Sequence, residues 1–155
     1  HSAGQGKDII AGDIQLLAQC ELTLPYDVIL IADVIEHLSN PGLMLAQVRL
    51  LCGESTRVLI TTPHAFGLLN YLRYMVGRFR EGLDHVMTFN AQNIRHLLER
   101  YGFVVEAVDT CFQTQMSRAR WLTRLGCWFF TRFPRFGGTL LLRVKIRSNT
   151  AEPQK

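Results

Sequence analysis

The clearest pattern along the chain is the aliphatic run from Asp27 to Ala32 (DVILIA), which lacks polar alternation. Parallel strands that are covered on both faces have this pattern, so we predict a central strand here. Asp33 to Ser39 then forms a turn, Asn40 is a candidate N-cap, and Pro41 suits a first helical position. The apolar positions that follow predict a helix that ends at Gly53.

A second unit of the same kind follows directly. Arg57 to Thr62 (RVLITT) predicts another buried strand, which Pro63 and His64 close. Phe66 to Val76 is apolar and aromatic and predicts a helix. Gly77 to Thr88 is a polar loop that is long enough to be a lid.

The rest of the chain continues the alternation. Asn90 is placed to cap a third helix, which Gly102 ends, and Phe103 to Thr110 predicts a strand. Thr139 to Arg147 alternates leucine or valine with basic residues, as an edge or antiparallel strand does. Near the N-terminus, Lys7 to Ile14 predicts a short strand that ends in an acidic turn.

Strands that alternate with helices at this spacing predict an α/β layered sheet with right-handed crossovers. Ligands of such sheets bind outside the carboxyl ends of the strands. This rule selects three segments of the chain as parts of one ligand site: Asp13, Asp33 to His37, and Thr61 to His64.

Composition indicates one domain, or most of one. At 155 residues and 48% hydrophobic content it is long enough for a single core. No apolar run reaches the roughly 18 residues of a membrane span, and the N-terminus lacks a signal-peptide pattern. The four cysteines are widely separated and form no CxxC pair, which favours a reducing, cytoplasmic setting.

The net charge of +4 comes mainly from basic residues in the last quarter of the chain. Within that quarter, Arg118 to Phe136 interleaves arginines with bulky aromatic residues. This pattern suits peripheral contact with an anionic membrane, and arginine contacts with base stacking would suit nucleic acid. A third interpretation is a hydrophobic insertion that covers the sheet or forms a subunit contact. We expect no nucleic-acid partner. Assembly into a homo-oligomer is possible.

Together, these segments resemble the class I S-adenosylmethionine-dependent methyltransferases, particularly the small-molecule group that includes the ubiquinone-type enzymes. The resemblance covers about Lys7 to Lys145. Five segments of the sequence carry the resemblance. GDI (Gly12–Ile14) resembles the end of the family's third strand, YDVILIADVIEHLSNP (Tyr26–Pro41) the fourth strand and its turn, and LLCGESTRVLITTPH (Leu50–His64) the fifth strand. DHVMTFNAQNIRHLLERYGF (Asp84–Phe103) resembles the loop and helix before the sixth strand, and GGTLLLRVKI (Gly137–Ile146) the seventh strand.

The resemblance implies a Rossmann-like methyltransferase sheet with helices on both faces and an antiparallel last strand. Residues 1–148 would form a partial methyltransferase domain, with 118–136 as a hydrophobic, basic insertion and 149–155 as a flexible tail. No glycine-rich nucleotide loop occurs in the 25 residues before DVILIA. The glycine-rich first turn of the family would lie upstream of His1, so the N-terminal strands are expected to be missing and this fragment alone to be inactive.

The resemblance also implies S-adenosylmethionine as cofactor. Asp13 would accept a hydrogen bond from the adenine amino group, and Asp33 would line the pocket, where a carboxylate favours a sulfonium charge. For both residues a simple turn-forming aspartate is the alternative. The predicted cofactor-binding residues are Asp13, Ile14, Ala32, Asp33, Val34 and His37.

The histidines are the candidates for proton transfer, because an ordinary imidazole pKa near 6.5 suits removal of a hydroxyl proton. We predict His85, in the lid loop, as the catalytic base, with His64 second; for each, the alternative is a histidine that ties a loop to backbone carbonyls. Glu36 and His37 could join them in a metal cluster. No HxH or HxxxH pair exists, so no metal is expected.

Methyl transfer requires mainly that nucleophile, carbon and sulfur are aligned, so the family needs no obligatory nucleophile. The sequence thus predicts S-adenosylmethionine-dependent methyl transfer to oxygen or carbon of a small or lipid-linked acceptor. A noncatalytic methyltransferase-like scaffold or partner-binding domain is the alternative. A dehydrogenase is disfavoured, because nothing in the sequence resembles a ribose or nicotinamide site.

Overall fold

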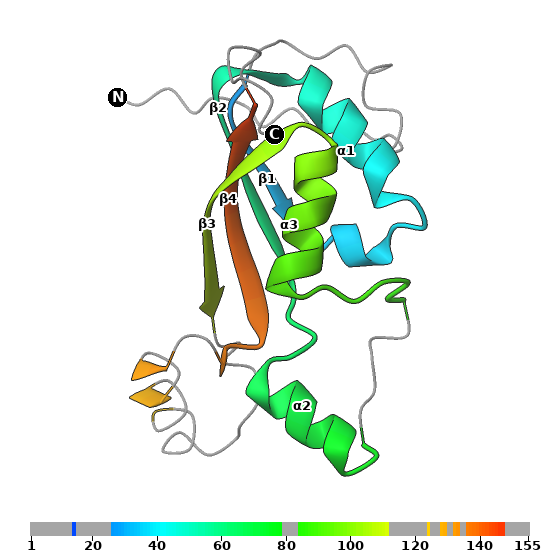
Figure 1. Cartoon of the computed structure of the whole chain (residues 1–155), viewed down its shortest axis with the longest axis vertical. Coiled ribbons are helices and arrows are strands. Elements are labelled where there is room, and N and C mark those ends of the chain that lie inside the picture. The colour runs from blue at the N-terminus through cyan, green and yellow to red at the C-terminus, as the bar shows by residue number, and fades with distance from the viewer. Residues whose placement is uncertain are drawn as a thin grey trace, which may run out of the picture.

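The structure is a computed structural model that describes residues 14, 26–78, 84–111, 124, 128–129, 132–133 and 136–147. Within these residues one four-stranded sheet has the order β1-β2-β4-β3 (Figure 1). The strands are β1 (Tyr26–Ala32), β2 (Cys52–Pro63), β3 (Phe103–Cys111) and β4 (Thr139–Ile146), and the helices are the 3-10 turn η2 (Ile35–His37), α1 (Pro41–Leu50), α2 (Leu68–Met75) and α3 (Ala91–Arg100).

Strand pairing confirms the predicted mixed sheet. β1 and β2 are parallel, whereas β4 is antiparallel to both of its neighbours, as predicted for the last strand. The suggestion of an edge position is wrong, because β4 lies between β2 and β3. Its alternation arises because one face packs into the core and the other carries the basic residues outward.

The prediction that Asp27 to Ala32 is covered on both faces is wrong for the described part of the chain. The place of this segment at the end of the described sheet agrees with the expectation that the N-terminal strands are missing. β1 pairs there with β2 alone. Its side chains alternate, so that Ile31 is buried while Val28 and Leu30 are 56% and 65% exposed. Although the run is aliphatic throughout, one face of β1 is therefore apolar and exposed.

Helix ends follow the predicted caps. The Asn40 side chain accepts a hydrogen bond from the Leu43 backbone N–H at 3.2 Å, and Pro41 opens α1. Asn90 caps α3 through the N–H groups of Gln92 and Asn93, and Gly102 follows the helix with φ of +79°. α1 ends at Leu50, earlier than predicted, because β2 already begins at Cys52 and includes Gly53.

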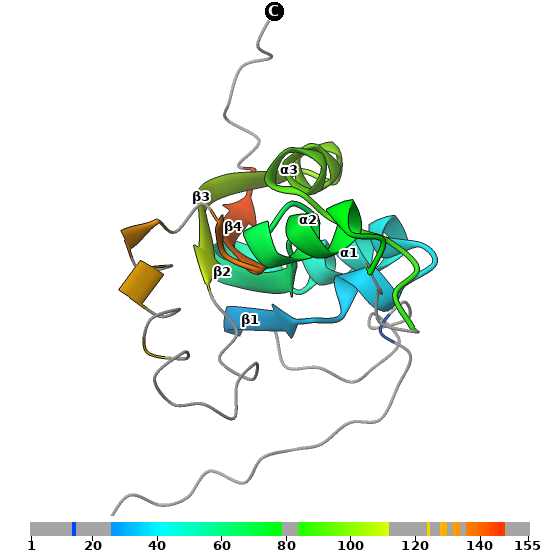
Figure 2. The same ribbon diagram turned by 90° about the horizontal axis from the view of Figure 1, so that it is seen from below.

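The hydrophobic core lies between the sheet and helices α1 and α3, which share one face of the sheet (Figure 2). Its largest fully buried side chains include Met44 and Leu45 of α1, Ile94 and Leu98 of α3, and Phe103 of β3. No described helix covers the opposite face of the sheet. The predicted segments Lys7 to Asp13 and 149–155, and most of 118–136, lie outside the described residues.

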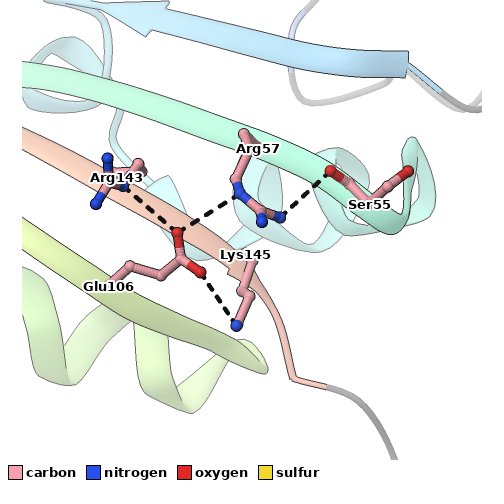
Figure 3. Close-up of polar contacts among 5 residues, drawn as sticks. All are labelled: Ser55, Arg57, Glu106, Arg143 and Lys145. Carbon is pink, nitrogen blue, oxygen red and sulfur yellow. Dashed lines mark hydrogen bonds and ion pairs between the residues drawn. The ribbon is translucent and has the colours of Figure 1, made fainter.

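The opposite face, which we call the open face, carries a cluster of charges around Glu106 (Figure 3). Its carboxylate lies 3.1 Å from Lys145 Nζ, 3.4 Å from Arg143 Nε and 3.6 Å from Arg57 Nε. The hydrogen bond from Lys145, together with the positive charges, lowers the pKa of Glu106 below its ordinary value. The basic residues of β4 thus form ion pairs with a residue of the neighbouring strand β3 of the same sheet.

α2 projects from the end of the molecule towards which β1 and β2 run (Figure 1). None of its residues is buried, and Leu72 and Met75 are exposed. Among the helices that the structure describes, none is both long and apolar enough to cross a membrane.

Candidate functional site

The chain leaves β1 through Asp33, which has a positive φ of 50°. This left-handed conformation is uncommon outside glycine, and aspartate and asparagine tolerate it best. The neighbouring strand fixes it: the Asp33 N–H donates to the Thr61 carbonyl at 3.1 Å, and the Thr61 hydroxyl donates to Asp33 Oδ1 at 3.1 Å. The carboxyl ends of β1 and β2 are thereby locked together, with the Asp33 side chain exposed.

One turn later, in η2, Glu36 is buried, with only 1% of its surface exposed. Its Oε2 accepts a hydrogen bond from the Thr62 hydroxyl at 3.0 Å, whereas its Oε1 has no hydrogen-bond partner among the described residues. Buried carboxylate oxygens are nearly always paired, because desolvating a charge without a partner is costly. The unpaired oxygen is therefore an unusual feature at a strand end where ligands are expected.

The Glu36 main chain also holds the segment that leads into α3. Its carbonyl accepts hydrogen bonds from the N–H groups of Val86 at 2.9 Å and Met87 at 3.1 Å. These two bonds bring His85 beside η2, although the two segments are almost 50 residues apart in sequence.

Glu36, His37 and His85 form one group, which we call the EHH cluster. One ligating atom from each lies within 4.8 Å of the others. The two imidazole rings meet edge to face, with centroids 4.7 Å apart. His37 Nδ1 lies 3.0 Å from the carbonyl oxygen of Asp84. A carbonyl can only accept, so Nδ1 carries the proton and Nε2 is left for another partner.

His64, the second predicted base, lies outside this cluster. Its Nδ1 donates to the Gly137 carbonyl at 3.1 Å, and its backbone N–H donates to the Gly138 carbonyl at 2.8 Å. The residue is 9% exposed and joins the end of β2 to the start of β4. This is the loop-tying arrangement that was the alternative to catalysis.

The predicted cofactor-binding residues fall into two groups. Ala32, Asp33, Val34 and His37 follow one another at the end of β1, where Ala32, Asp33 and His37 are exposed. Ile14 packs against the edge of the core, and Asp13 lies outside the described residues. The grouping around β1 is the one that the strand-end rule predicts.

The sequence names Glu36, His37, His64 and His85 as candidates for a metal cluster, but spacing alone gives no reason to join three of them. The expectation of no metal depended on the lack of a local histidine pair, but these ligands come from η2 and from a distant loop. Main-chain hydrogen bonds from Glu36 bring the two together, and a spacing rule cannot detect them. The only local signal was a glutamate and a histidine side by side after a strand.

Few residues of the aromatic and basic segment are described. Phe129, Phe133 and Phe136 pack together, with ring centroids 5.1 to 6.5 Å apart, and the Arg132 guanidinium lies 5.6 Å from the centre of the Phe133 ring. Trp128 beside them is 64% exposed. The described residues thus combine a small aromatic cluster with an exposed tryptophan.

Several solved structures share this fold. A S-adenosylmethionine-dependent methyltransferase from Clostridium acetobutylicum matches with a TM-score of 0.57 at 9% identity, over 90% of this chain and 64% of that one. Magnesium protoporphyrin IX methyltransferase (ChlM) from Synechocystis, solved with bound SAH, matches with a TM-score of 0.52 at 17% identity, over 90% and 50%. The mitomycin 7-O-methyltransferase MmcR gives 0.58 at 16% identity, over 90% and 34%.

The chain therefore spans between 34% and 64% of the length of these three structures. At such low identities the likeness shows the fold. No curated protein matches the chain. A family model described as a methyltransferase domain matches residues 4–108, which is well over half of the chain. The chain accordingly belongs to the methyltransferase domain family and has the Rossmann-like fold of the class I S-adenosylmethionine-dependent methyltransferases.

Proposed function

We propose that the protein transfers a methyl group from S-adenosylmethionine to a small or lipid-linked acceptor. The match of residues 4–108 to the methyltransferase domain family carries this proposal. It is supported by the polar residues that gather at the carboxyl ends of β1 and β2, where α/β sheets bind their ligands.

The residues at the end of β1 suit this cofactor. The exposed Asp33 carboxylate is held by the Thr61 hydroxyl, and it offers a negative charge near the place that a sulfonium would occupy. Ala32, Val34 and His37 flank it, and Asp13 and Ile14 complete the proposed set. When bound, the cofactor supplies an activated methyl group, so these residues have only to bind and orient it.

Calorimetry with SAH tests the cofactor site in the natural protein. Asp33→Asn should weaken binding about ten-fold, as expected when a charged hydrogen-bond acceptor is lost. Asp109→Asn is the matched control, because Asp109 is an exposed aspartate on β3. No SAH binding by the natural protein would overturn the proposed function, and equal binding by both variants would remove Asp33 from the site.

We infer that the 155-residue chain by itself binds SAH weakly and is inactive. Its sequence has no glycine-rich turn before β1, and such turns place backbone N–H groups on nucleotide ligands. Tight binding of SAH to this chain alone would contradict this inference.

We propose that His85 is the general base that removes the proton from the acceptor. It is half-buried at the edge of the EHH cluster, whereas His64 is buried and its Nδ1 is bound to a main-chain carbonyl. A general base contributes about 10²-fold to 10⁴-fold in rate. His85→Gln should therefore lower kcat strongly, with SAH affinity unchanged.

A lipid-linked acceptor is the finer part of the proposal, with peripheral membrane contact through 118–136. The exposed Trp128 supports it, as do the exposed apolar residues of α2, which projects from the end of the molecule that bears the proposed site. Amphipathic surfaces with aromatic and basic residues bind anionic interfaces. Flotation with vesicles of phosphatidylserine and phosphatidylcholine tests it: binding should fall when Leu72 and Met75 are both changed to Glu, and no binding by the natural protein would remove the lipid interpretation.

A further inference from the structure

We propose that the EHH cluster is a binding site for a divalent transition-metal ion, with Glu36, His37 and His85 as ligands. Two imidazoles and one carboxylate suit ions such as Zn²⁺, Mn²⁺ or Fe²⁺, whereas Mg²⁺ and Ca²⁺ prefer oxygen ligands throughout. The three ligating atoms already lie within 4.8 Å of one another. Ligands about 2.0 to 2.2 Å from one ion are at most about 4.4 Å apart, so small side-chain movements would close the site.

The unpaired oxygen of Glu36 is an independent observation that points to a cation. The carboxylate is almost completely buried, and the Thr62 hydroxyl fixes its orientation through Oε2. Oε1 has no hydrogen-bond partner among the described residues. An ion would pair with this oxygen, which none of the described residues binds.

The surroundings of His37 have the form of a metal-binding histidine. Such ligands commonly donate their second ring N–H to a carbonyl or carboxylate, which fixes the tautomer and directs the other nitrogen at the ion. His37 makes this contact with the Asp84 carbonyl at 3.0 Å. The neighbouring main chain, held by the bonds from Val86 and Met87 to Glu36, keeps His85 beside it. The ligands are thus brought together before any ion binds.

The site is open on one side. Glu36 is buried, His85 is half-buried and His37 is exposed. Three protein ligands and an open side match the arrangement of catalytic metal sites, which keep a position for water or substrate, rather than that of closed structural sites. We therefore infer that the ion would hold a ligand atom of the substrate.

The role of the ion rests on the proposed function. A hydroxyl oxygen of the acceptor, bound to the ion, becomes more acidic, as water does on zinc. Its O–H bond breaks and the proton goes to bulk water; the oxygen then forms a bond to the methyl carbon as the carbon–sulfur bond of the sulfonium donor breaks and its electron pair stays on sulfur. This selects an oxygen acceptor over carbon. As a ligand of the ion, His85 would not be the free base of the proposed function. The two roles of His85 are alternatives, and methyl transfer by chelator-treated protein distinguishes them.

Metal binding is measured first, without turnover. The natural protein, stripped of metal with a chelator, is titrated with Zn²⁺ by calorimetry and with Co²⁺ by visible absorption. We expect one ion per chain and Co²⁺ bands typical of nitrogen and oxygen ligands. Glu36→Gln and His85→Ala should each weaken Zn²⁺ binding about 100-fold or more, since loss of a supporting contact alone costs 10-fold to 100-fold.

Two variants serve as matched controls. His96→Ala removes an exposed histidine of α3, and Glu54→Gln removes an exposed glutamate of β2, both outside the cluster. Their Zn²⁺ affinity should equal that of the unchanged protein. If Glu36→Gln does not fold, His85→Ala decides, because His85 lies in a loop and not in the core. Zn²⁺ binding that is absent, or equal in His85→Ala and His96→Ala, would overturn the metal site.

The failure of this inference is distinguishable from that of the proposed function. SAH binding and methyl transfer that persist in chelator-treated protein without Zn²⁺ binding would remove only the metal site. Zn²⁺ binding at the cluster without any SAH binding would remove the methyltransferase role but leave the metal site standing.

Discussion

Glu36 and Glu106 are two carboxylates of the same small fold with opposite surroundings. Glu106, on the open face, has Lys145, Arg143 and Arg57 within 3.6 Å. Glu36 is 1% exposed, and its described contact is one hydroxyl at 3.0 Å. No lysine or arginine among the described residues forms an ion pair with it. Among the described residues, the carboxylate that water can hydrate has three cationic partners, and the buried one has none.

This difference indicates that the charge of Glu106 has a structural role and that the carboxylate of Glu36 has a functional one. Exposed ion pairs contribute little, because water and salt screen them, and their loss is easily tolerated. A buried carboxylate without a cation is costly to the fold, so its presence at a strand end requires a reason outside folding. We therefore expect ligands to bind at the polar site around Glu36. The larger network of ion pairs around Glu106 should only keep the protein soluble and help to align the strands.

The largest expected effect is on metal-dependent stability. At a Zn²⁺ concentration 100 times its Kd, binding adds about 2.7 kcal/mol, which raises the Tm of a chain of this size by about 5 to 11 °C. Thermal unfolding with and without Zn²⁺ measures it. Glu36→Gln should abolish the increase because a ligand is lost, and Glu106→Gln should keep it because the open face takes no part. An equal Tm increase in both variants would break the distinction between the two carboxylates.

Much of the frame around these two residues was predictable. Asn40 and Asn90 carry local capping signals that depend only on neighbouring backbone groups, and both caps are confirmed. The parallel pair β1 and β2 and the antiparallel β4 followed from hydrophobic pattern and from family resemblance. Local chemistry and periodicity suffice where the contacts are short in sequence.

The geometry of the EHH cluster and the exposure of β1 could not be predicted from the sequence, for the same physical reason. The approach of His85 to Glu36 depends on main-chain bonds from Val86 and Met87, which leave no trace in side-chain pattern. The exposure of Val28 depends on whether a second layer covers that face, and an aliphatic run looks alike in both cases. Long-range geometry decides both features.

The next effect concerns the hydroxyl that supports Glu36. Thr62→Val removes the described partner of its buried carboxylate and should cost about 1 to 3 kcal/mol, the range for leaving a buried polar group unpaired. Chemical denaturation of the metal-free protein measures it. Thr110→Val is the matched control: the Thr110 hydroxyl is buried and has no hydrogen-bond partner among the described residues, so its removal should be neutral or stabilising. A neutral Thr62→Val would mean that Glu36 does not depend on Thr62.

The smallest effect is expected on the open face and depends on pH. The Lys145 hydrogen bond and the nearby positive charges hold the pKa of Glu106 below its ordinary value. A depressed pKa in the folded state stabilises the protein above the unfolded pKa of about 4.3, and this contribution is lost as the pH falls through the folded value. The Tm difference between the unchanged protein and Glu106→Gln should therefore be small at pH 7, shrink further below about pH 4, and fade in about 1 M salt, where the screening length is about 3 Å. A difference that persists at low pH and high salt would show that Glu106 contributes by packing, and the contrast with Glu36 would then rest on burial alone rather than on charge.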